Sequence, residues 1–144
     1  MDNTVIDKIL KKHCAIYRGI YACDQLPAIT VRPSVIVVNT DPASQPGRHW
    51  ICMFFDVDGH GEFFDSFGIR PKRVFERYMD GCCIAWTFNK MQMQSLVSRF
   101  CGHYCIWYCI MKFRKATLNE LVRVMSRDTG LNDFLIHRFA CRLI

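Results

Sequence analysis

The apolar positions at the start of the chain follow the spacing of a helix. Between Val5 and Leu10 they recur three and four residues apart, which puts them on one helical face. Asp2 or Asn3 stands just before this run, and either side chain can cap a helix. We therefore expect a first helix here, followed by a loop over residues 17–27.

Short apolar runs with turn residues between them then indicate a block of strands. The run at residues 49–57 is apolar nearly throughout, so we expect it to be covered on both faces. A turn-rich segment at 41–47 precedes it, and a turn at Asp58–Gly59 follows it. A short basic helix is expected over residues 72–79, after Pro71. The strands that we expect are residues 34–40, 49–57, 62–68 and 83–88.

The pattern becomes helical again from Cys101. Three cysteines recur every four residues up to Cys109 with apolar residues between them, so this helix should be buried at the centre of the fold. Residues 117–126 begin with a capping box and indicate a further helix. Residues 128–133 interrupt the pattern, and a last helix is expected over residues 133–140.

The order of these elements, a helix, a block of strands and then helices, indicates an α+β fold. We expect a mixed or antiparallel sheet packed on the central buried helix, with further helices flanking it. The 144 residues are enough for one domain with a core. No repeat, low-complexity tract or linker divides them, so we expect a single domain over residues 1–144.

The composition is that of a globular protein inside a cell. Charged residues interrupt any apolar run near the amino end, which argues against a signal peptide, and the longest apolar run, Cys105–Met111, is too short to cross a bilayer. We therefore expect no membrane association and reduced thiols. The net charge of +6 permits contact with DNA, although it suits a solvated basic face equally well.

The nine cysteines raise the question of a metal site. Cys101, His103 and Cys105 are close in sequence, but His103 would point away from the helix face that the two cysteines share. Cys82 and Cys83 are adjacent, which is a poor geometry for chelation, and the chain has no CxxC pair. We expect no metal, and we expect most of the cysteines to be packing residues.

Cys101 has a different setting, because it opens the central helix. The positive end of the helix dipole and the free backbone amides favour its thiolate. A nucleophilic thiol also needs a histidine that takes its proton and a third group that orients the histidine. His49 begins one expected strand and Asp65 ends the next, and a reversal around residues 56–59 would place Asp65 opposite Trp50, beside His49. Taken singly, each residue also fits a plainer role in the core, on the surface or in a turn.

Acyl transfer also requires hydrogen-bond donors for the oxyanion. The backbone N–H of Cys101 is one candidate, and Gly102 allows a substrate to approach it closely. The side-chain amide of Gln94, in the loop before the helix, is a second candidate, although a glutamine in such a loop can simply be solvated. With His49 and Asp65, these residues form a candidate catalytic constellation.

Together these residues resemble the clan CE cysteine peptidases, which include the adenovirus maturation protease (adenain) and the SUMO-specific proteases. The resemblance rests on "HW" at a strand start, "FFDSFG" at the end of the next strand, and a glutamine and "CG" at the head of a buried helix. The adenain branch is more similar, because Gln94 stands seven residues before Cys101, whereas Gln92 fits that spacing less well. The resemblance covers about residues 5–112.

The resemblance implies a role for each member of the constellation. Cys101 would be the nucleophile that forms a thioester acyl-enzyme. His49 would act as general base and then as general acid towards the leaving amine, and Asp65 would orient it. Gln94 and the backbone amide of Cys101 would line the oxyanion hole.

The resemblance also implies roles beyond the four catalytic positions. Trp50 and Gly102 would shape the substrate site, although Trp50 suits core packing equally well. Adenains can be stimulated by a viral peptide, through a disulfide, and by DNA. Cys83 stands eleven residues before Gln94, a position that resembles that of the peptide-linked cysteine. A cysteine in the core of a strand is the plainer interpretation of Cys83. The chain departs from adenain in having Asp65 where glutamate is usual, and in a much shorter C-terminal part.

The resemblance therefore implies a cysteine endopeptidase of a virus or virus-like element. It would cleave capsid or core precursor proteins in the host nucleus or the virion, as a monomer without a cofactor other than an activating peptide or DNA. Two alternatives stay open: the same fold acting as an isopeptidase on a ubiquitin-like protein, and a non-enzymatic derivative that binds DNA or a capsid. The presence of all four catalytic residue types argues against the last.

Overall fold

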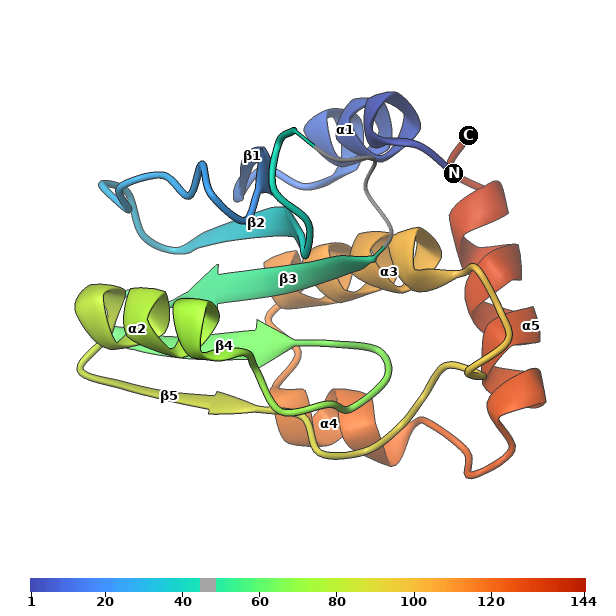
Figure 1. Cartoon of the computed structure of the whole chain (residues 1–144). Helices are drawn as coiled ribbons and strands as arrows, with labels where there is room; N and C mark the ends of the chain where they lie inside the picture. Colours follow the sequence, from blue (N-terminus) through green and yellow to red (C-terminus); the bar gives the residue numbers. More distant parts are fainter. Residues whose placement is uncertain (45–48) are drawn as a thin grey trace.

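A mixed β-sheet forms the centre of the computed structural model, which describes residues 1–44 and 49–144 (Figure 1). Within these residues five strands are ordered β1-β2-β3-β4-β5. β1 is parallel to β2 and β5 is parallel to β4, whereas the central pairs are antiparallel. The strands are β1 Tyr17–Ala22, β2 Ser34–Asn39, β3 Trp50–Phe55, β4 His60–Phe64 and β5 Ala85–Phe88.

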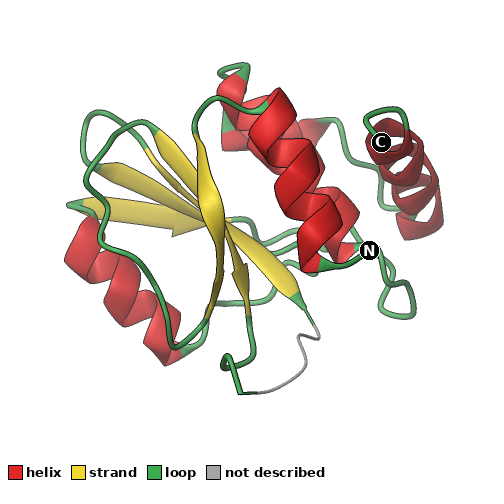
Figure 2. Ribbon diagram, turned by 90° about the horizontal axis from the view of Figure 1, so that it is seen from above, coloured by secondary structure: helices red, strands yellow, loops and turns green. Residues whose placement is uncertain are grey.

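Helices cover both faces of this sheet. Figure 2 shows α2 on one side and the remaining helices on the other, with the sheet between them. α3 packs directly against β3, and α1 and α5 pack against α3. The helices are α1 Asn3–His13, α2 Arg73–Cys82, α3 Cys101–Phe113, α4 Leu118–Arg123 and α5 Thr129–Cys141. The predicted α+β architecture, with a sheet packed on a central buried helix, is confirmed.

The two faces of the sheet belong to two hydrophobic cores, because successive side chains of a strand point in opposite directions. In β2, Val35 and Val37 join the core that contains α3, while Ile36 and Val38 join the core that contains α2. Burial on both faces explains why the strand segments read as continuous apolar runs instead of alternating ones. α3 is correspondingly buried on nearly every side, from Cys101 to Ile110.

The helix ends follow the predicted capping chemistry in two places. Asp2 caps α1, and its Oδ1 accepts a hydrogen bond from the Val5 N–H at 3.0 Å. Thr117 and Glu120 form the predicted capping box at α4. The segment 41–47, predicted as a turn-rich connection, lies partly outside the described residues.

The structure differs from three of the predicted elements. Residues 17–27 contain the strand β1 and not only a loop; β1 is an edge strand whose register with β2 is irregular around Gly19, so its burial does not alternate. The last helix begins at Thr129, not at residue 133, because Asp128 caps it by accepting from the Leu131 N–H at 3.1 Å. The third predicted strand is shifted towards the amino end and stops at Phe64.

None of the helices in the described part of the chain combines the length and the apolar character that crossing a membrane requires.

Candidate active site

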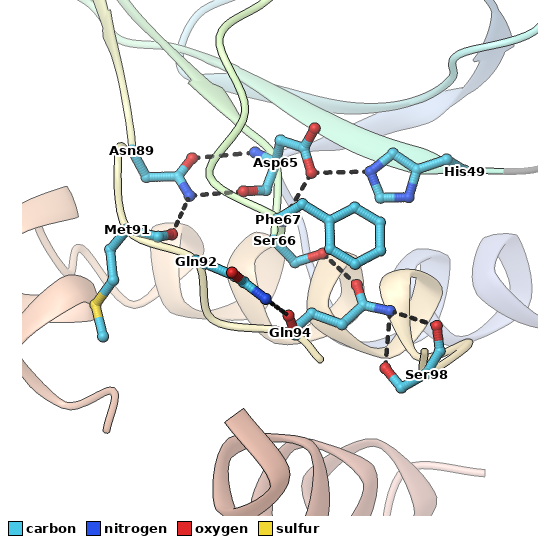
Figure 3. Close-up of polar contacts among 9 residues, drawn as sticks. All are labelled: His49, Asp65, Ser66, Phe67, Asn89, Met91, Gln92, Gln94 and Ser98. Atoms are coloured by element: carbon cyan, nitrogen blue, oxygen red, sulfur yellow. Dashed lines mark hydrogen bonds and ion pairs between the residues drawn. The ribbon is translucent and has the colours of Figure 1, made fainter. Parts of the chain in front are cut away.

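His49 and Asp65 meet at one edge of the sheet. His49 immediately precedes β3 and Asp65 immediately follows β4, and these strands are antiparallel neighbours. Nε2 of His49 lies 2.8 Å from Oδ1 of Asp65 (Figure 3). Cys52 pairs with Phe64, so the same register continued by one residue puts Asp65 opposite Ile51, one position from the place that the sequence predicted.

The carboxylate of Asp65 is held by the chain around it. Its Oδ1 also accepts the Phe67 N–H at 2.9 Å. Asn89, which sequence reasoning missed, holds the backbone of Asp65 from both sides: its Oδ1 accepts the Asp65 N–H at 3.0 Å, and its Nδ2 donates to the Asp65 carbonyl at 2.6 Å (Figure 3). Asn89 follows β5, which runs parallel to β4, so the two strands end at the same edge. That shared edge is the signal that could have identified it.

The imidazole of His49 is fixed in orientation. Its ring stacks on Phe67 with a centroid distance of 4.7 Å and an interplanar angle of 21°. Since Asp65 occupies Nε2, Nδ1 is the ring nitrogen left for a proton-transfer partner. Burial alone would lower the pKa of His49, but its interactions with Asp65 and Cys101 outweigh burial and raise that pKa to about 9.

Cys101 is the first residue of α3, and Phe100 before it provides no side-chain cap. The thiol is nearly covered, with Cys101 only 6% exposed. Burial by itself would raise the pKa of this thiol. The His49 imidazole and the backbone N–H groups of Trp50 and Gly102 act against burial, and the resulting pKa lies below the usual value for cysteine. Cys101 and His49 therefore each favour the charged form of the other.

Gln94 lies in the loop before α3, but its side chain is fully buried and its polar atoms are hydrogen-bonded to other residues. Its carbonyl oxygen accepts the Ser66 hydroxyl at 2.6 Å. Its amide nitrogen donates to the carbonyl and the hydroxyl of Ser98, at 3.1 and 3.0 Å (Figure 3). Ser66 and Ser98 were not singled out from the sequence, since nothing in their spacing marks them. In this conformation the amide donors of Gln94 are directed at the chain's own loop.

The remaining predicted residues occupy three different environments. Trp50 packs partly into the core, its indole N–H donates to Asn3 at 3.1 Å, and its backbone N–H faces the Cys101 thiol. Gly102 packs against Ile6 and directs its own N–H towards the same thiol. Cys83 follows α2 and is half-buried, and burial raises the pKa of its thiol.

Comparison with known proteins finds proteases among the similar sequences. No family model matches the sequence. A cysteine protease of African swine fever virus is 24% identical over 115 residues, which cover 72% of this chain and 42% of the relative. The protease of bovine adenovirus 4 is 28% identical over 108 residues, which cover 62% of this chain and 54% of the relative. The chain is similar to viral cysteine proteases. It spans about half the length of these curated relatives.

Solved structures show the same fold. The crystal structure of the African swine fever virus protease superposes with a TM-score of 0.68 at 18% identity, over 94% of this chain and 66% of that one. A SUMO protease structure superposes with a TM-score of 0.51 at 12% identity, over 100% of this chain and 79% of that one. The fold is thus the one shared by these two cysteine proteases, as the sequence predicted.

Proposed function

We propose that this chain is a cysteine endopeptidase in which Cys101 is the nucleophile, His49 the general base and Asp65 the residue that orients His49. One observation carries the proposal: the His49–Asp65 contact of 2.8 Å stands beside a thiol whose pKa is lowered by that same histidine. Sequence similarity to two viral proteases supports it independently. The arrangement needs only protein groups for its chemistry.

The reaction would proceed in two steps. The Cys101 thiolate attacks the scissile carbonyl, a tetrahedral oxyanion forms, and its collapse gives a thioester while His49 donates a proton to the leaving amine. Water, deprotonated by His49, then hydrolyses the thioester and releases the acid. The amides at the start of α3, which no side chain caps, would supply oxyanion donors beside the thiol. Gln94 can add its amide only after that amide leaves Ser98.

The activity is tested first by the reactivity of the thiols. At about pH 6 an ordinary thiol is almost wholly protonated and reacts slowly with iodoacetamide. Burial raises the pKa of Cys105 to about 11 and that of Cys14 to about 12, so both should stay unlabelled. We expect fast labelling confined to Cys101, read by mass spectrometry, and its loss in a His49→Ala variant. Equal rates for Cys101 and the other thiols would remove the chemical basis of the proposal.

The substrate class is proposed from the relatives. Because these are viral proteases, we propose structural precursor proteins of a virus or virus-like element as substrates, met inside the infected cell or the virion. Incubation of the protein with candidate precursors, followed by mass spectrometry of new amino termini, should give cuts that a Cys101→Ala variant does not make. An activating peptide or DNA would be recognised as an additive that increases the same cuts.

A second candidate is supported by the structural similarity to a SUMO protease. In this case the substrate would be a ubiquitin-like protein released from its conjugate by the same thioester chemistry. Ubiquitin and SUMO carrying a fluorogenic amide at their carboxyl ends separate the two candidates. Turnover of these reporters, with no cleavage of short peptides or viral precursors, would favour the isopeptidase. A chain that binds DNA yet fails every hydrolytic assay would instead be a non-enzymatic derivative.

A further inference from the structure

A second cluster of reactive side chains lies where α3 and α5 pack together. His103 is in the first turn of α3, and His137 and Cys141 are in the second half of α5. One ligand atom from each of these residues lies within 4.8 Å of the other two. His103 was expected to point away from the helix face of Cys101 and Cys105. Its ring centroid lies 5.2 Å from that of His137.

The two residues on α5 have the spacing of a chelating pair. His137 and Cys141 are four residues apart on one helix, so their side chains lie on the same face. The Cys141 sulfur is 3.4 Å from Nε2 of His137. Ligand atoms of a tetrahedral zinc site are about 3.3–3.7 Å apart, because each lies about 2.0–2.3 Å from the metal. Small side-chain rotations would therefore bring all three ligand atoms onto one ion.

His103 supplies the independent observation that points to a ligand. It is only 8% exposed, and its Nδ1 is buried without a hydrogen-bond partner among the described residues. A buried polar nitrogen that bonds to nothing destabilises the fold, and a bound ligand would satisfy it. Phe100 packs on both imidazoles, with centroid distances of 5.0 Å to His103 and 5.1 Å to His137, so it shields one side of the cluster from water. His137 and Cys141 are exposed, which leaves a path for an ion to enter.

We propose that His103, His137 and Cys141 bind a Zn²⁺ ion that connects the carboxyl-terminal half of α5 to the first turn of α3. Two imidazoles and one thiolate form a borderline-soft donor set that suits zinc and disfavours magnesium or calcium. A fourth position would be open to water or to another ligand. Because Cys101 is two residues before His103, the ion would also stabilise the helical turn that carries the proposed nucleophile. The site itself does not depend on peptidase activity.

Cobalt is the optical probe for this site, because Co²⁺ replaces zinc and absorbs visible light. The titration uses a Cys101→Ala background, which removes the other thiol that lies beside a histidine. We expect one equivalent of Co²⁺ to give the intense visible bands of tetrahedral coordination and a near-ultraviolet thiolate charge-transfer band, with both displaced by Zn²⁺. Cys141→Ser should abolish the charge-transfer band, and His137→Ala should weaken binding at least about tenfold, since each removes one ligand.

Matched controls separate this site from unspecific binding. Cys82→Ser and His60→Ala remove a cysteine and a histidine outside the cluster and should leave the titration unchanged. His137 and Cys141 are exposed, so their variants should fold, which circular dichroism checks. Zn²⁺ should also raise the thermal unfolding midpoint of the parent and not that of Cys141→Ser. The absence of saturable Co²⁺ binding, or binding that survives both cluster variants, would overturn the proposal.

Discussion

At the scale of single residues, the site divides into groups that the sequence could predict and groups that it could not. His49, Asp65 and Cys101 were predictable because each stands at the end of a recognisable element, and chain order together with strand pairing brings such ends together. Asn89 was missed although it follows a strand that ends at the same edge as β4. Ser98 could not be predicted, because its hydrogen bonds to the Gln94 amide leave no pattern in the sequence.

In the proposed mechanism Asn89 positions Asp65, so its removal should lower the catalytic rate through Asp65. In Asn89→Ala the Asp65 backbone loses two hydrogen bonds, so the carboxylate is free to shift. We expect kcat to fall about 10- to 100-fold with KM little changed, because a displacement of about 1 Å can cost that much. Stopped assays against a cleavable peptide measure both parameters.

Asn132 is a matched control for this prediction. It is as buried as Asn89, at 2% exposure, and its side chain bonds to the Met93 and Ser126 carbonyls and not to Asp65. Asn132→Ala should lose about 1–3 kcal/mol of stability with kcat and KM little changed. If both variants lose the same share of kcat, Asn89 is structural only.

The pH dependence of activity follows from the opposite pKa shifts of the pair. The reactive thiolate–imidazolium state exists above the pKa of Cys101, which is lowered, and below that of His49, which is raised to about 9. Thus kcat/KM should rise with pH through the first value and fall as pH passes about 9. Measuring initial rates across the pH range in constant-ionic-strength buffers would give the bell-shaped curve.

Asp65→Asn tests which group raises the pKa of His49. Removal of the carboxylate charge takes away the largest favourable interaction of the imidazolium, so the alkaline limb should move to lower pH. The rate at the optimum should drop by about 10²- to 10⁴-fold, because the histidine also loses its orienting partner. If the alkaline limb stays at the same pH, a group other than Asp65 raises the pKa of His49.

At the scale of elements, the sequence predicted what apolar periodicity and capping can show. The buried strands and α3 were recognisable because their apolar runs are long, and α4 because its capping box is local. β1 was missed because an irregular edge strand with a single buried residue lacks periodicity. The start of α5 was predicted too late because Gly130 in its first turn weakens the helical pattern. In the structure the Asp128 cap outweighs the low helix propensity of this glycine.

A buried ion pair joins β4 to α3 and should be sensitive to the loss of either partner. Lys112 Nζ lies 3.1 Å from Glu62 Oε2, and the Tyr108 hydroxyl donates to Glu62 Oε1 at 2.7 Å. The Lys112 side chain is only 6% exposed. Glu62→Ala would leave this ammonium without its counter-charge, and we expect a loss of about 3–5 kcal/mol in the free energy of unfolding, measured by urea titration.

The double variant Glu62→Leu with Lys112→Met removes both charges and should recover much of that loss, because no buried charge is left unpaired. Lys11 is the surface comparison: it pairs with Asp7 at 2.8 Å, but its side chain is 69% exposed. Lys11→Ala should therefore cost no more than about 1 kcal/mol. A Glu62→Ala variant as stable as Lys11→Ala would contradict the prediction.

At the scale of the whole molecule, the arrangement of the sheet and helix layers was predictable, whereas the partners and substrates of the protein were not. The order of elements together with apolar runs on both faces of the sheet determines where helices must lie. Charge determines far less, because +6 over 144 residues suits a DNA-binding surface and a merely soluble one alike. The viral relatives extend well beyond the part that matches this chain, so the substrates of this chain are proposed and not shown.

The dependence of the Cys101 thiol on distant segments has a consequence for the protein's own synthesis. His49 and Asp65 leave the ribosome well before Cys101, and the groups that lower the thiol pKa are His49 just before β3, the Trp50 N–H in β3 and the Gly102 N–H in α3. Until α3 docks on the finished sheet, the sulfur is an ordinary thiol with a pKa of about 8.5. A nascent or misfolded copy therefore has only an ordinary thiol at Cys101, and the proposed peptidase activity would arise only once folding is complete.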